Sequence, residues 1–356
     1  MIKSISIKGF KSIRALEELE LGYINVIIGA NGTGKSNFIE VFRIVSAMLK
    51  NGGLREYVAG ASDVFFFGGP KKTSRIQVRV TLDASIYDFE LAPTDDGFLM
   101  LQNEKVSLFR GDMNSLHLTS QGFASELPQR TDSEAIKQTY EAIRNCQVYH
   151  FHDTGKLAAV RRYCQTSHDT YLQSDGGNLA PFLYKIQQRH ADCYRDICQT
   201  IKLAIPFFDD FILEPNDNED IRLCWRQIGL LDFPMRPHQL SDGALRFICL
   251  ATALLQPNPP STIIIDEPEL GLHPEAIYLL AEMMITASRR TQLVIATQSP
   301  LLLDNFAIDD IIVAKRQHGT TSFERLREND YNVWLEDFSV GELWTHDIIH
   351  GGTVHE

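Results

Sequence analysis

The sequence lacks the features that define membrane, disulfide-bonded and zinc-cluster proteins. No window approaches the roughly 18 consecutive apolar residues that cross a bilayer. The first residues, 1–5, are typical of a strand rather than of a signal peptide with a long apolar stretch. The six cysteines form no C-x-x-C pair, so neither a zinc site nor a disulfide framework is predicted. We therefore expect a cytoplasmic protein with reduced thiols and no membrane association.

Repeats, low-complexity tracts and sustained heptads are also absent, and the missing heptads exclude a long coiled-coil arm. The formal net charge of −12 opposes a surface that binds nucleic acid by general attraction. Small basic clusters at 71–72 and 161–162 leave local contact with DNA open. The 356 residues are 44% hydrophobic, which is enough for one large or two ordinary folded domains.

The first chemical signal is a glycine-rich loop between an apolar strand pattern and a helical pattern. Residues 23–28 form a β-rich apolar run, and residues 29–36 read G-A-N-G-T-G-K-S. Apolar residues then recur at helical spacing from Phe38 to Leu49. Strand, glycine loop and helix in this order are the context that a phosphate-binding P-loop requires.

Each residue type in this loop has a chemical reason. Glycines let the backbone N–H groups converge on phosphate oxygens, and the new helix presents its positive end to the anion. Lys35 can reach the β- and γ-phosphates, and the Ser36 hydroxyl can ligate Mg²⁺. We therefore predict ATP contacts along the loop from Asn31, Gly32, Thr33, Gly34, Lys35, Ser36 and Asn37.

An acidic strand end follows more than two hundred residues later. Residues 263–265 are three isoleucines, followed by Asp266 and Glu267. A P-loop enzyme needs a carboxylate on the neighbouring strand to hold Mg²⁺, which fits Asp266. Glu267 then stands where a general base could polarise water. A further apolar run, 293–297, ends at Gln298, which either senses the γ-phosphate or simply closes a proline-terminated strand.

Upstream of the acidic strand, Ser241, Asp242 and Gly243 precede a run of helical periodicity. Ser241 is a good N-cap, so an ordinary capped helix accounts for the pattern. The alternative is that this helix end meets a γ-phosphate bound by another subunit.

Together these motifs resemble the ABC ATPase superfamily, in its SMC/RecF/OLD-like branch. They are most similar to stand-alone bacterial predicted ATPases of the AAA/RecF-like group, which also show the segments 148–153, 175–180 and 341–344. The resemblance implies an α/β head with a mixed central sheet, an antiparallel β subdomain and a helical lobe that carries the signature motif, 241–243. It also implies ATP and Mg²⁺ as cofactors and the strand-to-turn residues Lys11 and Ser12 against the nucleotide.

Catalytic roles follow from the same resemblance for Lys35, Glu267 and Gln298. Most ABC proteins carry histidine where this chain has Gln298, and glutamine cannot take up a proton near neutral pH. For the Q-loop glutamine, Gln77 and Gln147 are both candidates.

The resemblance further implies a homodimer in which each P-loop faces the other copy's signature helix across ATP. It implies a DNA-related process, either genome maintenance or anti-phage defence. The alternative is a slowly hydrolysing scaffold that restrains a separately encoded nuclease or toxin. A transporter subunit fits poorly. Only 56 residues follow Pro300 (356 − 300), and a TOPRIM nuclease domain needs well over ~100, so we expect such an effector on another chain.

The segments between the motifs complete the prediction. We expect the first part of the head in 1–132, a mainly helical lobe in 133–235, the second part of the head in 236–330 and a tail in 331–356. Antiparallel strands are expected in 75–110 and helices from 133 to 203. His150 and His152, with Asp153, either ligate a metal or form hydrogen bonds at a strand end. Residues 175–178 are interpreted as a turn and helix cap.

Overall fold

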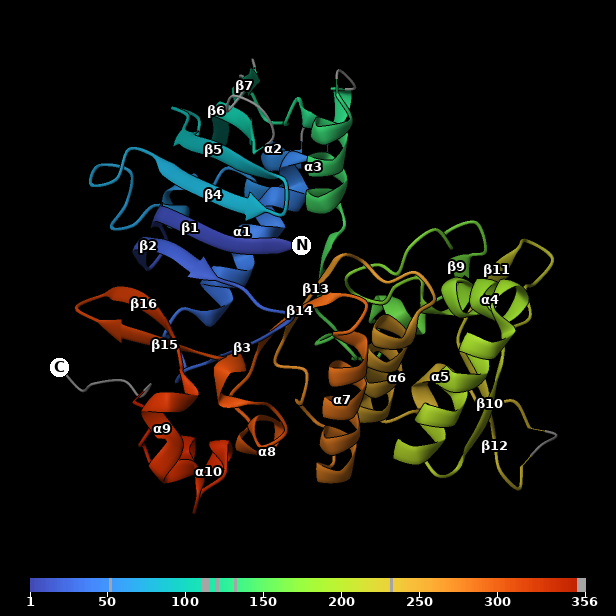
Figure 1. Ribbon diagram of the computed structural model, residues 1–356. Helices are drawn as coiled ribbons and strands as arrows, with labels where there is room; N and C mark the ends of the chain where they lie inside the picture. The colour runs from blue at the N-terminus through green and yellow to red at the C-terminus, as the bar shows by residue number, and fades with distance from the viewer. Residues whose placement is uncertain (51–52, 110–114, 119–121, 131–132, 231–232, 351–356) are drawn as a thin grey trace.

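The computed structural model describes residues 1–50, 53–109, 115–118, 122–130, 133–230 and 233–350 (Figure 1). The helices are α1 (Lys35–Met48), α2 (Gly53–Val58), α3 (Glu134–Arg144), α4 (Leu179–Arg189), α5 (Ala191–Ala204), α6 (Asp242–Leu255), α7 (Pro274–Ala287), α8 (Pro300–Leu303), α9 (Glu328–Leu335) and α10 (Val340–Thr345). The strands are β1 (Ile2–Phe10), β2 (Ile13–Glu20), β3 (Ile24–Ile28), β4 (Ile76–Leu82), β5 (Ser85–Pro93), β6 (Leu99–Leu108), β7 (Ser115–Leu118), β8 (Cys146–Tyr149), β9 (Cys164–Gln165), β10 (Phe208–Ile212), β11 (Asp220–Ile221), β12 (Cys224–Gln227), β13 (Thr262–Asp266), β14 (Gln292–Ala296), β15 (Ile311–Gln317) and β16 (Thr320–Arg325).

The central sheet has the order β16-β15-β3-β14-β13-β8, with β16 antiparallel to β15 and every other pair parallel. Its inner strands are continuous apolar runs, as a sheet buried on both faces requires. Asp266 pairs with Ala296, and Ala296 pairs with Ile27. The loops that follow β3, β13, β14 and β8 therefore leave the sheet at one common edge.

A second sheet of order β2-β1-β4-β5-β6-β7 is antiparallel throughout. The predicted strands in 75–110 are confirmed as β4, β5 and β6. Helix α1 packs between the two sheets: its Phe38 and Phe42 share a buried cluster with Ile264 and Val294 of the central sheet and with the inner side chains of β1, β4 and β5.

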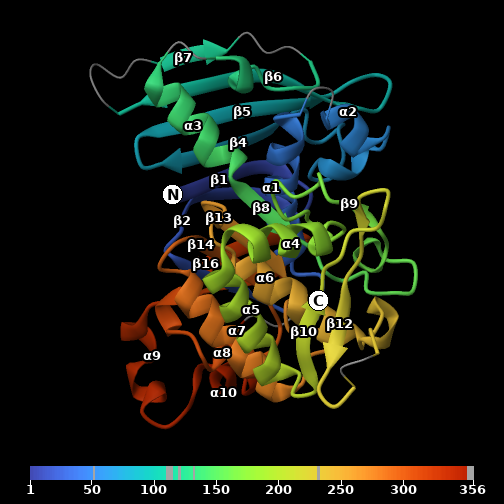
Figure 2. The ribbon, with the colours of Figure 1, turned by 90° about the vertical axis from the view of Figure 1, so that its right-hand side faces the viewer.

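The opposite face of the central sheet is covered by the helical lobe, α4 to α7 (Figure 2). Side chains alternate along a strand, so Ile263 and Ile265 of β13 join the helical cluster while Ile264 between them faces α1. The sheet thus separates α1 from the signature helix α6. The mixed α/β fold predicted from the sequence is confirmed.

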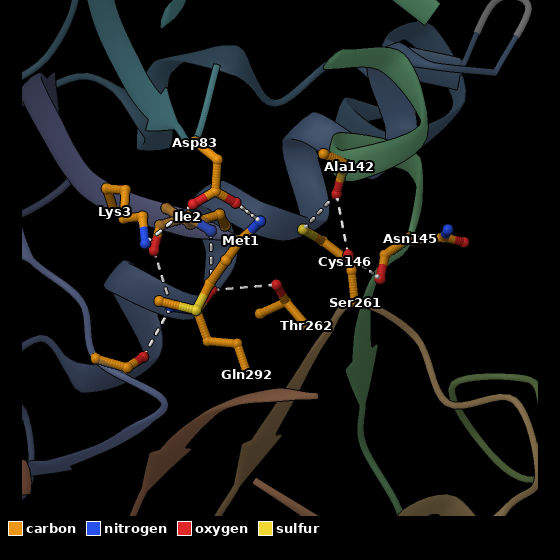
Figure 3. A network of polar contacts seen from close by, with 11 residues as sticks. Met1, Ile2, Lys3, Asp83, Ala142, Asn145, Cys146, Ser261, Thr262 and Gln292 are labelled. Carbon is orange, nitrogen blue, oxygen red and sulfur yellow. Dashed lines mark hydrogen bonds and ion pairs between the residues drawn. The ribbon is translucent and has the colours of Figure 1, made fainter. Parts of the chain in front are cut away.

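A polar network at the amino-terminal end of β1 joins the two sheets (Figure 3). The main-chain N–H of Ile2 donates to Gln292 Oε1 at 3.1 Å, and Gln292 Nε2 donates back to the Ile2 carbonyl at 2.8 Å. The amino terminus and Lys3 both pair with Asp83, at 2.7 and 2.9 Å. The bonds to Gln292 fix β1 against β14 at the sheet edge opposite the P-loop, whereas those to Asp83 stay within the antiparallel sheet.

The expectation of helices from 133 to 203 is confirmed only in part. Helices α3, α4 and α5 form, but β8 and a segment without α-helix, 150–178, which contains the short strand β9, lie between α3 and α4. Val148 and Tyr149 suit a buried strand and pair with Ile264 and Ile265 of β13. The four-part division of the chain stays a prediction, and its boundary at 132 and the residues 351–356 of the tail lie outside the described residues.

The segment 175–178 forms the predicted turn, in which Gly177 N–H donates to Asp175 Oδ1 at 2.9 Å. Asn178 precedes α4 but its side chain makes no capping bond; its amide instead donates to the carbonyls of His168 and Tyr171, both at 2.7 Å. No helix in the described ranges has the length and apolarity that crossing a bilayer requires.

Candidate nucleotide site

The P-loop turns sharply into α1 at Gly34. Its φ of 109° lies in the left-handed region that favours glycine. A Cβ there would lie 2.5 Å from Thr321 Oγ1 and 2.9 Å from Ser12 Oγ. The loop therefore needs glycine both for its backbone angle and for the close approach of β16.

Lys35, the first residue of α1, points back into the loop. Its Nζ donates to the Gly29 carbonyl at 2.7 Å and lies 4.0 Å from Glu267 Oε1. The side chain is buried, and this desolvation lowers the pKa of Lys35 even though Glu267, Asp266 and Glu269 act to raise it. The ammonium thus contacts main-chain carbonyls of the loop and lies near Glu267. In this buried site of low dielectric it can interact strongly with phosphate.

Asp266 ends β13 and is buried, and its Oδ1 has no hydrogen-bond partner within the described part of the chain. Burial raises the pKa of the Asp266 carboxyl, although the nearby Ser36 hydroxyl opposes this shift. An orphaned buried carboxylate oxygen beside a hydroxyl is a donor set that suits Mg²⁺, which prefers oxygen ligands. The residues present therefore fit the predicted ion.

Glu267 and Gln298 are joined directly. Gln298 Nε2 donates to Glu267 Oε1 at 2.6 Å and to Asn31 Oδ1 at 2.9 Å. Glu267 has a φ of 44°, and its N–H donates to the Ala296 carbonyl at 2.8 Å. The amide of Gln298 therefore connects the acidic strand end to the P-loop.

Glu269 is a buried acid that the sequence analysis left without a role. Thr297 Oγ1 donates to its Oε1 at 2.6 Å, and the Gln298 N–H donates to the same oxygen at 3.2 Å. Burial raises the pKa of Glu269 to about 7, and neighbouring Glu267 adds to the shift. Its position three residues after Asp266 was the sequence feature that could have indicated a place in the site.

Lys11, Ser12 and Asn37 line a hollow of about 550 Å³ beside the P-loop. Ser12 Oγ accepts from Asn37 Nδ2 at 2.7 Å, so the predicted contact residues of the β1–β2 turn and of α1 are connected. The remaining lining is Val64, Phe66, Phe67, Gly68, Lys72, Arg316, His318 and Gly319.

The β15–β16 hairpin supports the P-loop, and the sequence analysis missed it. Thr321 Oγ1 donates to the Thr33 carbonyl at 2.6 Å, and Arg316 Nη1 donates to the Gly32 carbonyl at 2.9 Å. No local motif marks these residues, because the pairing of β15 with β3 and of β16 with β15 carries them to the loop.

The signature residues lie on the helical lobe. Ser241 is confirmed as the N-cap of α6, accepting from the Ala244 N–H at 3.1 Å. Asp242 pairs with Arg161 at 2.8 Å, and a Cβ on Gly243 would overlap the Gly271 carbonyl oxygen. The P-loop, Asp266, Glu267 and Gln298 thus gather at one sheet edge, whereas the hydrogen bonds of Ser241 and Asp242 stay within their own lobe.

Arg246 of α6 is buried and joins two segments near the acidic strand. Its Nε donates to the Phe151 carbonyl at 3.0 Å and its Nη2 to the His152 carbonyl at 3.3 Å, while its Nη1 donates to the Leu270 carbonyl. Desolvation lowers the pKa of Arg246, although Asp242 acts to raise it.

The two histidines after β8 do not belong to a metal cluster. Their rings lie 4.1 Å apart, but no group of three potential ligands exists among the described residues. His152 Nε2 instead contacts the Asp266 carbonyl at 2.8 Å, in line with the hydrogen-bonded alternative. In the described part of the chain, the Q-loop candidates do not contact the acidic strand end. Gln77 donates to Glu90 within the antiparallel sheet, and Gln147 lies within β8, where it pairs with Ile263 of β13.

Among known proteins, residues 24–304 match a family described as "AAA domain, putative AbiEii toxin, Type IV TA system". No protein with a curated description matches the chain.

Solved structures similar to this chain include SMC heads. One is an Smc head bound to the C-terminal winged-helix domain of ScpA, with a TM-score of 0.63 and 16% identity over 93% of this chain and 99% of the other. Another is the Smc head with an extended coiled coil bound to the C-terminal domain of ScpA, from Pyrococcus furiosus, with a TM-score of 0.56 and 16% identity over 94% and 98%. At this identity the likeness shows a shared fold.

Proposed function

Because the chain belongs to this AAA-domain family and shares the fold of SMC heads, we propose that it binds Mg-ATP and hydrolyses it. The observation that carries the proposal is the contact of Gln298 with both Glu267 and Asn31. This contact joins the three segments that a P-loop hydrolase brings to the γ-phosphate.

In this mechanism Lys35 binds the β- and γ-phosphates, and Ser36 with Asp266 holds the metal ion. Mg²⁺, when bound, neutralises charge on the phosphates. Glu267 accepts a proton as water attacks the γ-phosphorus and the bond to the β-phosphate oxygen breaks. Gln298 holds Glu267 through an N–H donor and does not itself take up the proton. Lys11, Ser12 and Asn37 line the hollow next to the loop, where the rest of the nucleotide binds.

We further propose a head-to-tail homodimer. Ser241, Asp242 and Gly243 form the N-terminal end of a helix that is separated from α1 by the central sheet. The N–H groups at the N-terminal end of a helix attract phosphate. For the N-terminal end of α6, that phosphate would be the γ-phosphate of ATP bound by a second copy. ATP would then join two copies, and its hydrolysis would let them part.

The experiment that tests the enzymatic proposal is phosphate release from ATP by the wild-type chain and by Glu267→Gln. We expect steady release by the wild type and its loss in the variant, with ATP binding retained. Release at the wild-type rate by Glu267→Gln would remove Glu267 from the mechanism.

We propose that the ATP cycle serves a DNA-related process, genome maintenance or anti-phage defence, in the cytoplasm. A second hollow lined by Lys8, Arg14, Lys72 and Arg75 supports local contact with DNA despite the net charge of −12. Two of these cations are already paired with acids, Lys8 with Glu17 at 3.0 Å and Arg75 with Glu90 at 3.1 Å. Stimulation of ATP turnover by DNA, weakened by salt and by Arg14→Glu, is the expected result.

The second candidate is an ATP-regulated scaffold that restrains a separate nuclease or toxin. The residue type of Gln298 supports it, because glutamine lacks the titratable group of the histidine that most ABC proteins carry at this position. The family description and the ScpA-bound state of the similar Smc heads also agree with a protein partner. Copurification of a stoichiometric effector, with turnover unaffected by DNA, would favour the scaffold over the DNA-stimulated motor.

A further inference from the structure

The segment that follows β8 enters the nucleotide site from the side opposite the P-loop strand. Strands β8 and β13 run parallel, with Tyr149 paired to Ile265, so residues 150–153 leave the sheet beside Asp266. His152 Nε2 lies 2.8 Å from the Asp266 carbonyl oxygen. A carbonyl only accepts hydrogen bonds, which requires that Nε2 of His152 carries the proton and donates it.

This bond acts on the main chain of Asp266, one of whose carboxylate oxygens has no hydrogen-bond partner among the described residues. Within the described ranges, Asp266 Oδ1 is buried and unpaired, while its main-chain carbonyl is held by His152. A carboxylate at the last position of a strand takes its direction from the main chain that carries it. Fixing that carbonyl therefore restrains the main chain from which the Asp266 side chain, with Oδ1, projects into the site.

His152 is itself held in place from the helical lobe. Arg246 donates to the carbonyls of Phe151 and His152, and Phe151 is buried in the helical cluster. The ring of His150 packs against that of His152 with centroids 4.1 Å apart. The segment that carries the imidazole N–H to Asp266 is thus restrained by these hydrogen bonds and ring contacts.

We propose that His152 is a positioning residue for the metal ion: its N–H orders the main chain at Asp266 so that the free carboxylate oxygen faces Mg²⁺. The inference rests on the proposed binding of Mg-ATP. It gives the hydrogen-bonded alternative for His152 a function: the imidazole orders a metal ligand through a hydrogen bond and does not itself bind the metal ion.

Two substitutions test the N–H donor and the ring volume of His152 separately. His152→Gln keeps an N–H at a similar reach and loses the ring, whereas His152→Phe keeps the ring volume and loses the N–H. Affinity for ATP is measured by calorimetry with Mg²⁺ and with EDTA, and Mn²⁺ binding to the ATP complex is followed by electron paramagnetic resonance. Neither readout needs turnover. His117→Ala, at an exposed position of β7, is the control for loss of a histidine away from the site.

Loss of groups that orient a metal ligand costs roughly 10- to 100-fold in metal affinity. We expect His152→Phe to lower Mn²⁺ affinity by about tenfold or more and to shrink the gain in ATP affinity that Mg²⁺ gives, with ATP affinity in EDTA unchanged. His152→Gln and His117→Ala should stay close to the wild type, and thermal unfolding checks that each variant is folded.

Wild-type Mn²⁺ affinity in His152→Phe would overturn the inference, and so would an equal loss in His152→Gln. A wild-type chain whose ATP affinity does not respond to Mg²⁺ would instead count against the proposed function itself. The two failures are therefore distinguishable.

Discussion

Gln298 donates its side-chain N–H to Glu267 Oε1 at 2.6 Å, and the same nitrogen donates to Asn31 Oδ1 at 2.9 Å. One amide thus reaches both the carboxylate proposed as the base and the loop proposed to hold the phosphates. This arrangement makes Gln298 an orienting group rather than a proton carrier.

Replacing Gln298 by alanine tests that role. Misplacement of a reacting group by about 1 Å can cost about a hundredfold in rate, so we expect kcat for ATP to fall by between about tenfold and a hundredfold. ATP affinity should change little, because Lys35 and the loop remain. Steady-state phosphate release and calorimetry measure the two quantities. An unchanged kcat would show that Glu267 keeps its orientation without the amide.

Lys35→Ala removes the buried ammonium at the start of α1. Hydrogen bonds to charged groups contribute about 1.5–3 kcal/mol, so ATP affinity should fall by roughly ten- to a hundredfold. Lys50→Ala, just beyond the other end of α1, is the control for loss of a lysine. If calorimetry found equal ATP affinity in Lys35→Ala and the control, this loop would not be the phosphate site.

Ser241→Ala should reduce turnover more than it reduces ATP binding by the separate chain. The lost N-cap bond costs about 1 kcal/mol of stability in its own right. Ser133→Ala serves as the matched control, since Ser133 caps α3 in the same way, accepting from the Ile136 N–H at 3.2 Å. Should both variants lose turnover to the same extent, the effect of Ser241 would be one of stability alone.

Glu269 predicts a pH dependence of stability. Its pKa in the folded chain is raised from 4.5 to about 7, so the folded state retains a proton that the unfolded chain loses as pH rises between these values. The free energy of unfolding therefore falls across this window, and Glu269→Gln should abolish that fall.

Denaturant unfolding at pH 4.5 and pH 8 measures the effect. Relative to the wild type, Glu269→Gln should be more stable at pH 8 than at pH 4.5 by on the order of 2–3 kcal/mol. Glu282→Gln, on an exposed position of α7, should show no such difference between the two pH values. Parallel pH profiles for wild type and Glu269→Gln would contradict the assignment.

The parts of the site that are continuous in sequence could be predicted. The strand before the P-loop, the helix that begins at Lys35, the N-cap Ser241 and the acidic end of β13 each follow from residue type and local spacing. These features depend on interactions within a few residues, which a single sequence displays.

The parts that depend on strand pairing could not be predicted. Thr321 reaches Thr33 across 288 positions, and His152 reaches Asp266 across 114. Neither has a neighbour in the sequence that indicates its partner, and the strand expected at His150 gave no sign that it pairs with β13. The order of strands in the central sheet decides these contacts.

The central claim is that ATP joins Lys35 of one copy to the helix end at Ser241 of another. Its most direct test is the mass of Glu267→Gln in saturating Mg-ATP, measured by size-exclusion chromatography with light scattering, with and without Ser241→Arg added. We predict twice the 40.3 kDa of one chain for Glu267→Gln, and the mass of one chain, with ATP still bound, once Ser241→Arg blocks the helix end. A single-chain mass for Glu267→Gln in Mg-ATP, or a dimer that Ser241→Arg leaves intact, would contradict the account.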